Sequence, residues 1–208
     1  MEKKIALAAV SVAALFIGGT FAVVKLNAPD QDFAQCGATA VAGSSIGGPF
    51  ELVNKDGVTV TDTDVITGPT VLYFGYTFCP DVCPLDNMRN SQAVQILDEK
   101  GISVTPVFIS IDPERDTPER VGEFAYNFHD RMIGLTGTPE QTDAASKAYR
   151  TYYQKEANGD PEYYLVDHSV QSYFNIPGYG VIDVFGHNDT PENVAQRMEC
   201  LIEMVGAN

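Results

Sequence analysis

The chain has 208 residues, 44% of them hydrophobic, so it can bury one sizeable core, and we expect one folded domain with appendages. Its formal net charge of −15 argues against a nucleic-acid partner, whose phosphates require a basic surface, and against binding of anionic lipid by the folded surface. Beyond that, the acidity indicates only that the domain is soluble.

The N-terminal segment predicts a membrane anchor. Lys3 and Lys4 precede an uncharged apolar run over residues 5–24, and Lys25 closes it. About 20 helical residues span the hydrocarbon core of a bilayer, whereas the apolar part of a cleaved signal peptide usually has about 7–15. The excess of lysines before the run predicts an inside N-terminus. With no Arg/Ser-rich transit segment, we expect residues 1–25 to be an uncleaved single-pass helix in a bacterial inner membrane, with the C-terminal domain in the periplasm.

A linker and a folded domain are expected to follow this anchor. Residues 26–46 are mostly small and polar, which is typical of a linker. The domain of residues 47–208 is predicted to begin with a β-hairpin, because strand-like segments at 50–53 and 58–60 flank an Asp-Gly turn.

Two thiols follow the first predicted buried strand. The apolar run at residues 71–74 predicts that strand, Gly75 ends it, and Cys79 and Cys83 come next. Pro84 suits the first position of a helix, which would make Cys83 the N-cap. The positive end of the helix dipole would then lower the pKa of Cys83 and favour the thiolate that binds metals or attacks disulfides. We therefore predict a reactive dithiol in preference to a structural disulfide across a surface turn.

The remaining sequence alternates between helices and strands. Thr-Pro-Glu triplets at 117–119, 138–140 and 190–192 each offer an N-cap hydroxyl, a proline at the first helical position and an early carboxylate. Alternation predicts a parallel sheet, and a closing hairpin makes it mixed, so we expect an α/β, thioredoxin-like fold with its dithiol at the first strand-to-helix turn. The predicted elements are helix 85–100, strand 102–111, helix 121–131, strand 132–135, helix 142–154, extended segment 163–166, strands 170–176 and 181–185, and helix 191–205.

Three motifs together carry a resemblance to a known family. Residues 75–84 contain the C-x-x-x-C pair, residues 110–119 contain Asp-Pro-Glu-Arg-Asp, and residues 166–169 contain Asp-His-Ser. In this order and at these spacings, they resemble the Sco (SenC) proteins, which are membrane-anchored, thioredoxin-fold copper chaperones. The resemblance extends from about Gly47 to the last helix, and Phe78 stands where the family often has histidine.

The resemblance implies a metal site. In the Sco family, both cysteines and one distant histidine bind copper, and the matching residues are Cys79, Cys83 and His168. Two thiolates and an imidazole suit Cu(I), Cu(II) or Zn(II), and three ligands leave a position open to a recipient. We expect His168 at the start of an antiparallel strand, where thioredoxins have a cis-proline facing the dithiol. His129 and His187 are expected to be surface or hydrogen-bonded core residues.

Other candidate residues have structural interpretations. Asp112 and Asp116 could form a carboxylate cluster for a metal, but a turn before a Thr-Pro helix start explains them. Met88 and Met198 have helical spacing and are expected in the core.

Cys36 and Cys200 remain as a pair outside the shared motifs. In an oxidising compartment, a disulfide between them could join the linker to the last helix. The sequence alone leaves open whether the two residues meet.

The motifs predict a copper metallochaperone that delivers copper to, or prepares, the binuclear copper site of cytochrome c oxidase subunit II. Other periplasmic copper chaperones or thiol reductants are expected as further partners. Copper would load only onto the reduced dithiol. Two alternatives stay open: an enzyme, namely a thiol–disulfide oxidoreductase that reduces the oxidase's cysteines with Cys79 and Cys83, and a redox or copper sensor that signals through a partner.

Overall fold

The structure, a computed structural model, describes residues 33–39, 41–156, 160 and 163–207. The predicted transmembrane helix of residues 1–25 and the predicted linker up to residue 32 lie outside the described residues. Within the described ranges, no helix combines the length and the apolar character needed to cross a membrane.

The described part of the chain alternates between strands and helices, as predicted. The single turn α2 after the first hairpin has no counterpart in the sequence prediction. The elements in chain order are η1 (Phe33–Cys36), β1 (Glu51–Asn54), β2 (Thr59–Thr61), α2 (Asp62–Val65), β3 (Thr70–Gly75), α3 (Val82–Asp98), β4 (Thr105–Ser110), α4 (Pro118–Tyr126), β5 (Ile133–Thr136), α5 (Pro139–Ala148), β6 (Tyr153–Lys155), β7 (Val166–His168), β8 (Ser172–Ile176), β9 (Gly180–Phe185) and α6 (Pro191–Val205).

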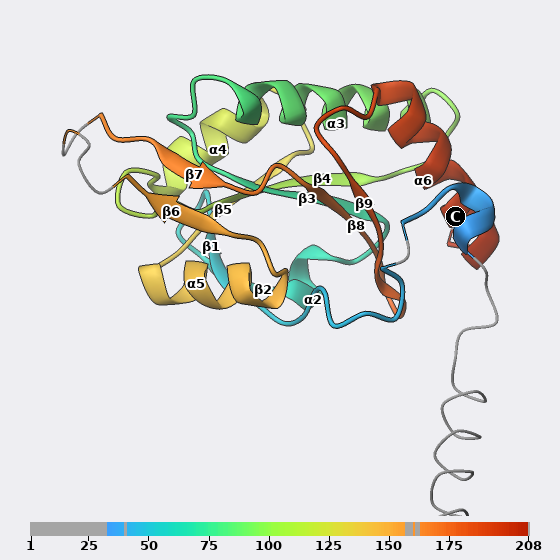
Figure 1. The fold of residues 1–208 in the computed structure, drawn as a ribbon, viewed down its shortest axis with the longest axis horizontal. Helices are drawn as coiled ribbons and strands as arrows, with labels where there is room; N and C mark the ends of the chain where they lie inside the picture. The colour runs from blue at the N-terminus through green and yellow to red at the C-terminus, as the bar shows by residue number, and fades with distance from the viewer. Residues whose placement is uncertain (1–32, 40, 157–159, 161–162, 208) are drawn as a thin grey trace, which may run out of the picture. The chain divides into compact units, whose positions relative to one another are not determined.

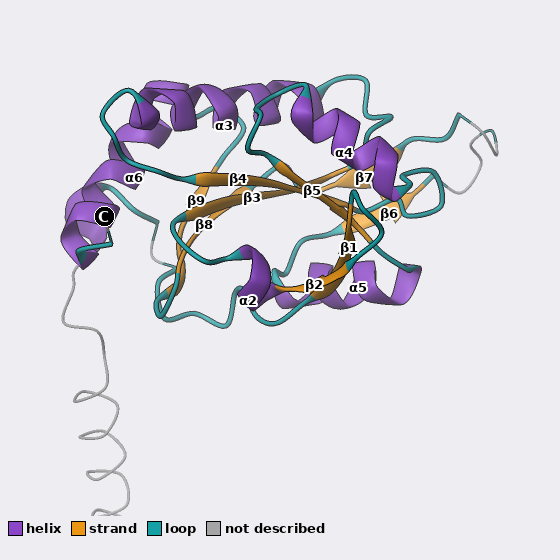
Figure 2. Ribbon diagram, turned by 180° about the vertical axis from the view of Figure 1, so that it is seen from behind, coloured by secondary structure: helices purple, strands orange, loops and turns teal. Residues whose placement is uncertain are grey.

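A seven-stranded mixed sheet forms the centre of the domain, in the order β2-β1-β5-β4-β3-β8-β9. Strands β3, β4 and β5 run parallel, and the antiparallel hairpins β1–β2 and β8–β9 extend the two edges. Helices α3, α4 and α6 lie on one face, and α2 and α5 lie on the other (Figures 1 and 2). The predicted mixed sheet and its N-terminal hairpin are confirmed.

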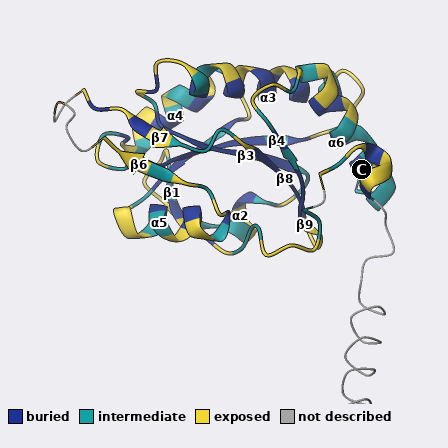
Figure 3. Ribbon diagram, in the orientation of Figure 1, coloured by how far each residue is buried: buried dark blue, intermediate teal, exposed yellow. Residues whose placement is uncertain are grey.

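The burial of β3 follows from helices on both sides of the sheet. All six residues of this strand are buried, as its continuous apolar run predicts, and the central strands are dark in Figure 3. Met198 on α6 is fully buried, whereas the side chain of Met88 on α3 is 44% exposed. The prediction that both methionines belong to the core is therefore wrong for Met88.

The three Thr-Pro-Glu triplets begin helices, as predicted. Thr117, Thr138 and Thr190 are the N-caps of α4, α5 and α6, and the hydroxyl of each accepts a hydrogen bond from a backbone N–H of the first turn. The predicted helix 142–154 is wrong over its last part, because α5 ends at Ala148. Arg150 has a φ of 51°, which turns the chain out of the helix and into β6.

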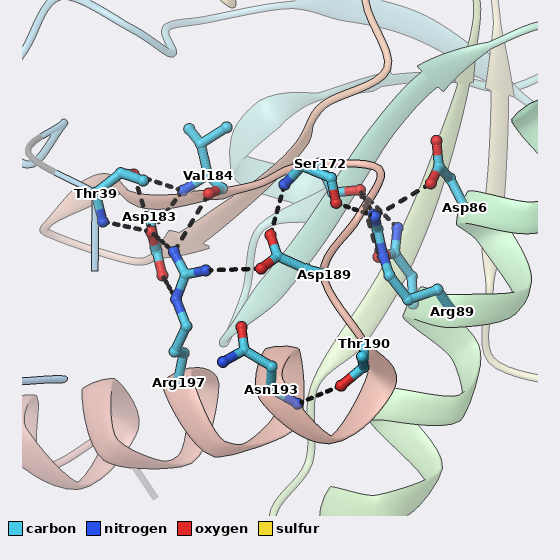
Figure 4. Close-up of polar contacts among 12 residues, drawn as sticks. Thr39, Asp86, Arg89, Ser172, Asp183, Val184, Asp189, Thr190, Asn193 and Arg197 are labelled. Atoms are coloured by element: carbon cyan, nitrogen blue, oxygen red, sulfur yellow. Dashed lines mark hydrogen bonds and ion pairs between the residues drawn. The ribbon is translucent and has the colours of Figure 1, made fainter. Parts of the chain in front are cut away.

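Cys36 and Cys200 form a disulfide, with their Cα atoms 5.6 Å apart and 164 positions between them in the sequence. Nearby, the backbone N–H and the hydroxyl of Thr39 donate to the carboxylate of Asp183, which also pairs with Arg197 at 2.6 Å (Figure 4). Cys36 and Thr39, which lie within the predicted linker, are therefore attached to α6 and β9.

Loss of this disulfide is expected to destabilise the protein strongly. Because it closes a long loop, Cys200→Ser should lower the free energy of unfolding by about 2–5 kcal/mol, as measured by urea denaturation of the full chain. The wild-type protein in reductant should unfold like the variant. Equal stability of the variant and the oxidised wild-type protein would contradict this expectation.

Candidate metal centre

The cysteine loop connects β3 to α3, and the helix begins earlier than predicted. Helix α3 starts at Val82, so its N-cap is Asp81 and Cys83 lies within the first turn. The prediction of Cys83 as the N-cap is therefore wrong. The backbone N–H of Cys83 donates to the sulfur of Cys79 at 3.4 Å. Cys79, and not Cys83, thus has its sulfur at the positive end of the helix.

The structure brings the three predicted site residues together. Nε2 of His168 lies 3.3 Å from Sγ of Cys83 and 4.0 Å from Sγ of Cys79, and the three ligand atoms all lie within 4.8 Å of one another. Nδ1 of His168 lies 2.7 Å from the carbonyl oxygen of Ser169, a contact that directs Nε2 towards the sulfurs. His168 ends β7 and does not begin the antiparallel strand β8, which corrects its predicted position.

The wall behind the sulfurs is closely packed. Cys83 is fully buried and Cys79 is 9% exposed. The hydroxyl of Tyr73 lies 3.9 Å from Sγ of Cys83, and a Cβ added to Gly75 would lie 2.7 Å from the same sulfur. The ring of Tyr76 meets the His168 ring edge-on at 5.6 Å. A side chain at position 75 would therefore collide with the sulfur of Cys83, so Gly75 is required for space as well as for ending β3.

Asp116 fastens the cysteine loop from behind. Its fully buried carboxylate accepts hydrogen bonds from the backbone N–H of Thr77 at 2.9 Å, the hydroxyl of Thr77 at 2.5 Å and the hydroxyl of Ser110 at 2.6 Å. Burial raises the pKa of this carboxyl, against the effect of the three donors. Asp112 instead pairs with Arg115. The motif at residues 110–119 thus supports the site structurally, which agrees with its interpretation as a turn.

The two thiols have opposite electrostatic environments. A hydrogen bond from the Cys83 thiol is the main cause that lowers the pKa of Cys79 to about 3; His168 and backbone N–H groups add to it, and partial burial opposes it. Burial, followed by the neighbouring Cys79 sulfur, raises the pKa of Cys83. The prediction of a lowered pKa at Cys83 is therefore wrong, and the thiolate is favoured at Cys79 instead.

His168 complements this thiolate. Burial disfavours its charged form, but the hydrogen bond to Cys79 and the contact with the Ser169 carbonyl outweigh burial and raise the pKa of the imidazole. His129 contacts Asp98 at 3.6 Å, and His187 contacts Asp86 at 2.9 Å, so both are hydrogen-bonded or ion-paired side chains, as expected, and neither belongs to the group of ligand atoms.

The donor set fits a soft or borderline metal ion. Thiolate sulfur and imidazole nitrogen suit copper and zinc, whereas magnesium and calcium prefer oxygen ligands. Among the residues that the structure describes, Cys79, Cys83 and His168 are the one group of three His, Cys, Asp or Glu side chains close enough to hold a metal ion. Three ligands are fewer than the four of a closed structural zinc site.

Comparison with known proteins identifies close relatives. The family model described as SCO1/SenC matches residues 38–203. Protein SenC of Rhodobacter capsulatus is 49% identical over 203 residues, which cover 97% of this chain and 91% of that protein.

Solved structures share the fold. The crystal structure of Arabidopsis thaliana ScoI with copper bound is 38% identical, has a TM-score of 0.69, and matches over 78% of this chain and 99% of its own. BsSco, a member of the Sco family of cytochrome c oxidase assembly proteins, is 22% identical with a TM-score of 0.59, over 77% of this chain and 91% of its own.

The unequal thiols should be visible in alkylation of the reduced, metal-free protein. With a pKa of about 3, Cys79 stays a thiolate, so iodoacetamide should label it at a rate that is nearly constant between about pH 5 and 8. Cys83 should stay protonated and react slowly, which peptide mass spectrometry of the wild type and of Cys79→Ser would measure. Faster labelling of Cys83, or a rate at Cys79 that rises tenfold per pH unit, would contradict the assignment.

Proposed function

The chain belongs to the SCO1/SenC family, and from this premise we propose that it is a copper metallochaperone that delivers copper to the binuclear copper site of cytochrome c oxidase subunit II. The observation that carries the proposal is the convergence of Cys79, Cys83 and His168, with ligand atoms within 4.8 Å of one another. Copper bound to the related Arabidopsis ScoI supports copper as the cargo. The description of the Sco family as cytochrome c oxidase assembly proteins supports the oxidase as recipient.

The geometry suits a carrier that must also release its metal. Cys79 and Cys83 would bind copper as thiolates, and His168 would bind through Nε2. Because a disulfide between the cysteines offers no thiolate, only the reduced protein would load copper. Cys83 is fully buried, so a ligand of the recipient would approach from the side of Cys79 and His168 and enter the open coordination position.

We propose the same cellular location as the sequence predicts. Residues 1–25 would anchor the chain in a bacterial inner membrane, with the domain in the periplasm. The apolar run between Lys4 and Lys25 supports the anchor. The disulfide between Cys36 and Cys200 supports an oxidising compartment. Other periplasmic copper chaperones would supply the metal, and thiol reductants would keep the dithiol reduced.

Removal of the imidazole should weaken copper binding. His168→Ala is expected to lower the Cu(I) affinity of the reduced protein by more than about 100-fold, because loss of a residue that merely supports a ligand already costs about 10–100-fold. Competition with a chromophoric Cu(I) chelator measures the affinity. His129→Ala removes a histidine that contacts Asp98 and not the site, and it is the matched control, with an affinity close to wild type. Unchanged affinity in His168→Ala would remove His168 from the ligand set.

Transfer and reduction can be separated with the recipient domain. The copper-loaded protein should transfer copper to a chemically reduced, metal-free subunit II domain, and His168→Ala should transfer much less, as measured by metal analysis of the two proteins after their separation. The oxidoreductase alternative predicts the reverse pattern: no transfer to the reduced domain, but reduction of the oxidised domain that survives in His168→Ala.

A further inference from the structure

The segment that carries His168 is not part of the central sheet. Strands β6 and β7 pair with each other, with Tyr153 opposite His168, and neither belongs to the seven-stranded sheet. Figure 1 shows this hairpin beside the ends of the central strands. The position of His168 relative to the two sulfurs therefore depends on β8, which begins four residues later and pairs with β3, and on contacts between the hairpin and the body of the domain, such as the hydrogen bond from the backbone N–H of Val166 to the hydroxyl of Tyr76 at 3.2 Å.

A column of alternating cations and aromatic rings crosses from the body to the hairpin. The guanidinium carbon of Arg120 lies 4.7 Å from the centre of the Phe78 ring, and that of Arg115 lies 4.7 Å from the same ring. Arg115 also lies 3.5 Å from the ring of Tyr164, over which Nζ of Lys155 lies at 3.7 Å. Such contacts are strongest where water is excluded.

Hydrogen bonds fix Arg115 at the centre of this column. Its Nε donates to Asp112 at 2.5 Å, and its Nη1 donates to the backbone carbonyl of Tyr164 at 3.0 Å. The hydroxyl of Tyr164 donates to the other oxygen of Asp112 at 2.6 Å. The Arg115 side chain is only 11% exposed, so solvent screens these contacts weakly.

We propose that Arg115 is a positioning residue that holds His168 against the dithiol. Phe78 directly precedes Cys79, and Tyr164 lies just before β7, which ends at His168. One guanidinium therefore joins the cysteine loop to the histidine hairpin. The test by copper affinity rests on the proposed function, whereas the test by hydrogen exchange uses the metal-free protein and does not.

The contacts of Arg115 with Phe78, Tyr164 and Asp112 require arginine specifically. A planar guanidinium can lie between two rings while its edge donates to a carboxylate and a carbonyl, whereas a lysine ammonium is a compact point charge that cannot do both. When Arg115 is lost, the hairpin samples positions in which His168 is away from the sulfurs. The apparent copper affinity then falls in proportion to the population of the competent state.

The test compares Arg115→Met, Arg115→Lys and the control Arg120→Met in the full chain. Arg120 is exposed and lies against Phe78, and among the described residues it forms no hydrogen bond, ion pair or ring contact with the hairpin. We expect Arg115→Met to lower Cu(I) affinity about 10–100-fold, with poor rescue by lysine and a change within about twofold for Arg120→Met. Wild-type affinity in Arg115→Met would overturn the proposal.

A double-mutant cycle separates positioning from general damage. If Arg115 acts through His168, Arg115→Met should cause no further loss of affinity in a His168→Ala background. An equal loss in both backgrounds would overturn the proposal. If Arg115→Met fails to fold, Phe78→Leu tests the same column, because the Phe78 ring is 41% exposed and its replacement should be tolerated. The same coupling to His168→Ala is expected.

The metal-free readout is independent of the proposed function. Hydrogen exchange of the backbone amides of residues 163–168 should speed up in Arg115→Met, while α3 and the Arg120→Met control keep wild-type protection. Wild-type protection of the hairpin in Arg115→Met would overturn the proposed positioning role of Arg115 even if copper affinity fell. Weak copper binding by the wild type would refute the metallochaperone function and leave this readout standing.

Discussion

The site depends on the hydrogen bonds that the sulfur of Cys79 accepts at the start of α3. The backbone N–H of Cys83 lies 3.4 Å from this sulfur, and Nε2 of His168 lies 4.0 Å from it. A largely buried anion is unstable unless donors surround it, and these two groups add to the hydrogen bond from the Cys83 thiol, which is the main cause of the lowered pKa of Cys79. The backbone N–H donor is available because α3 begins at Val82, and the imidazole is available because the hairpin brings His168 to Cys79. The environment of the Cys79 sulfur therefore depends both on the local structure of α3 and on the tertiary packing of the hairpin.

The two halves of the site are supported differently. The cysteine half follows β3, which is buried along its whole length, and Asp116 fixes the loop through three hydrogen bonds. The histidine half belongs to a hairpin outside the central sheet, which is attached by contacts such as those of Arg115 with Tyr164. The dithiol and the imidazole are therefore held in place by separate sets of contacts.

The sequence predicted those features that depend on neighbouring residues. The thioredoxin-like α/β fold with its mixed sheet and the three Thr-capped helices are confirmed, because caps and turns involve only a few adjacent side chains. The N-cap was misplaced because proline is tolerated throughout a first turn, whose N–H groups lack intrahelical partners, so Pro84 did not fix the start of α3. His168 was identified through a family resemblance, and the role of Arg115 was missed. Their contacts span 85 and 49 positions of the sequence, which no local pattern encodes.

The electrostatics of the dithiol bear on the choice between carrier and reductase. The lowered pKa of Cys79, caused mainly by the hydrogen bond from the Cys83 thiol, favours the thiolate and with it the reduced form of the protein. A dithiol whose reduced form is stabilised gives up electrons reluctantly, and a thiolate of such low basicity is a weak nucleophile towards disulfides. Both properties are unfavourable for an enzyme that reduces the cysteines of another protein. Both are favourable for a carrier, because a dithiol that stays reduced keeps its two sulfurs available to the metal, and a weakly basic thiolate releases it more readily to a recipient.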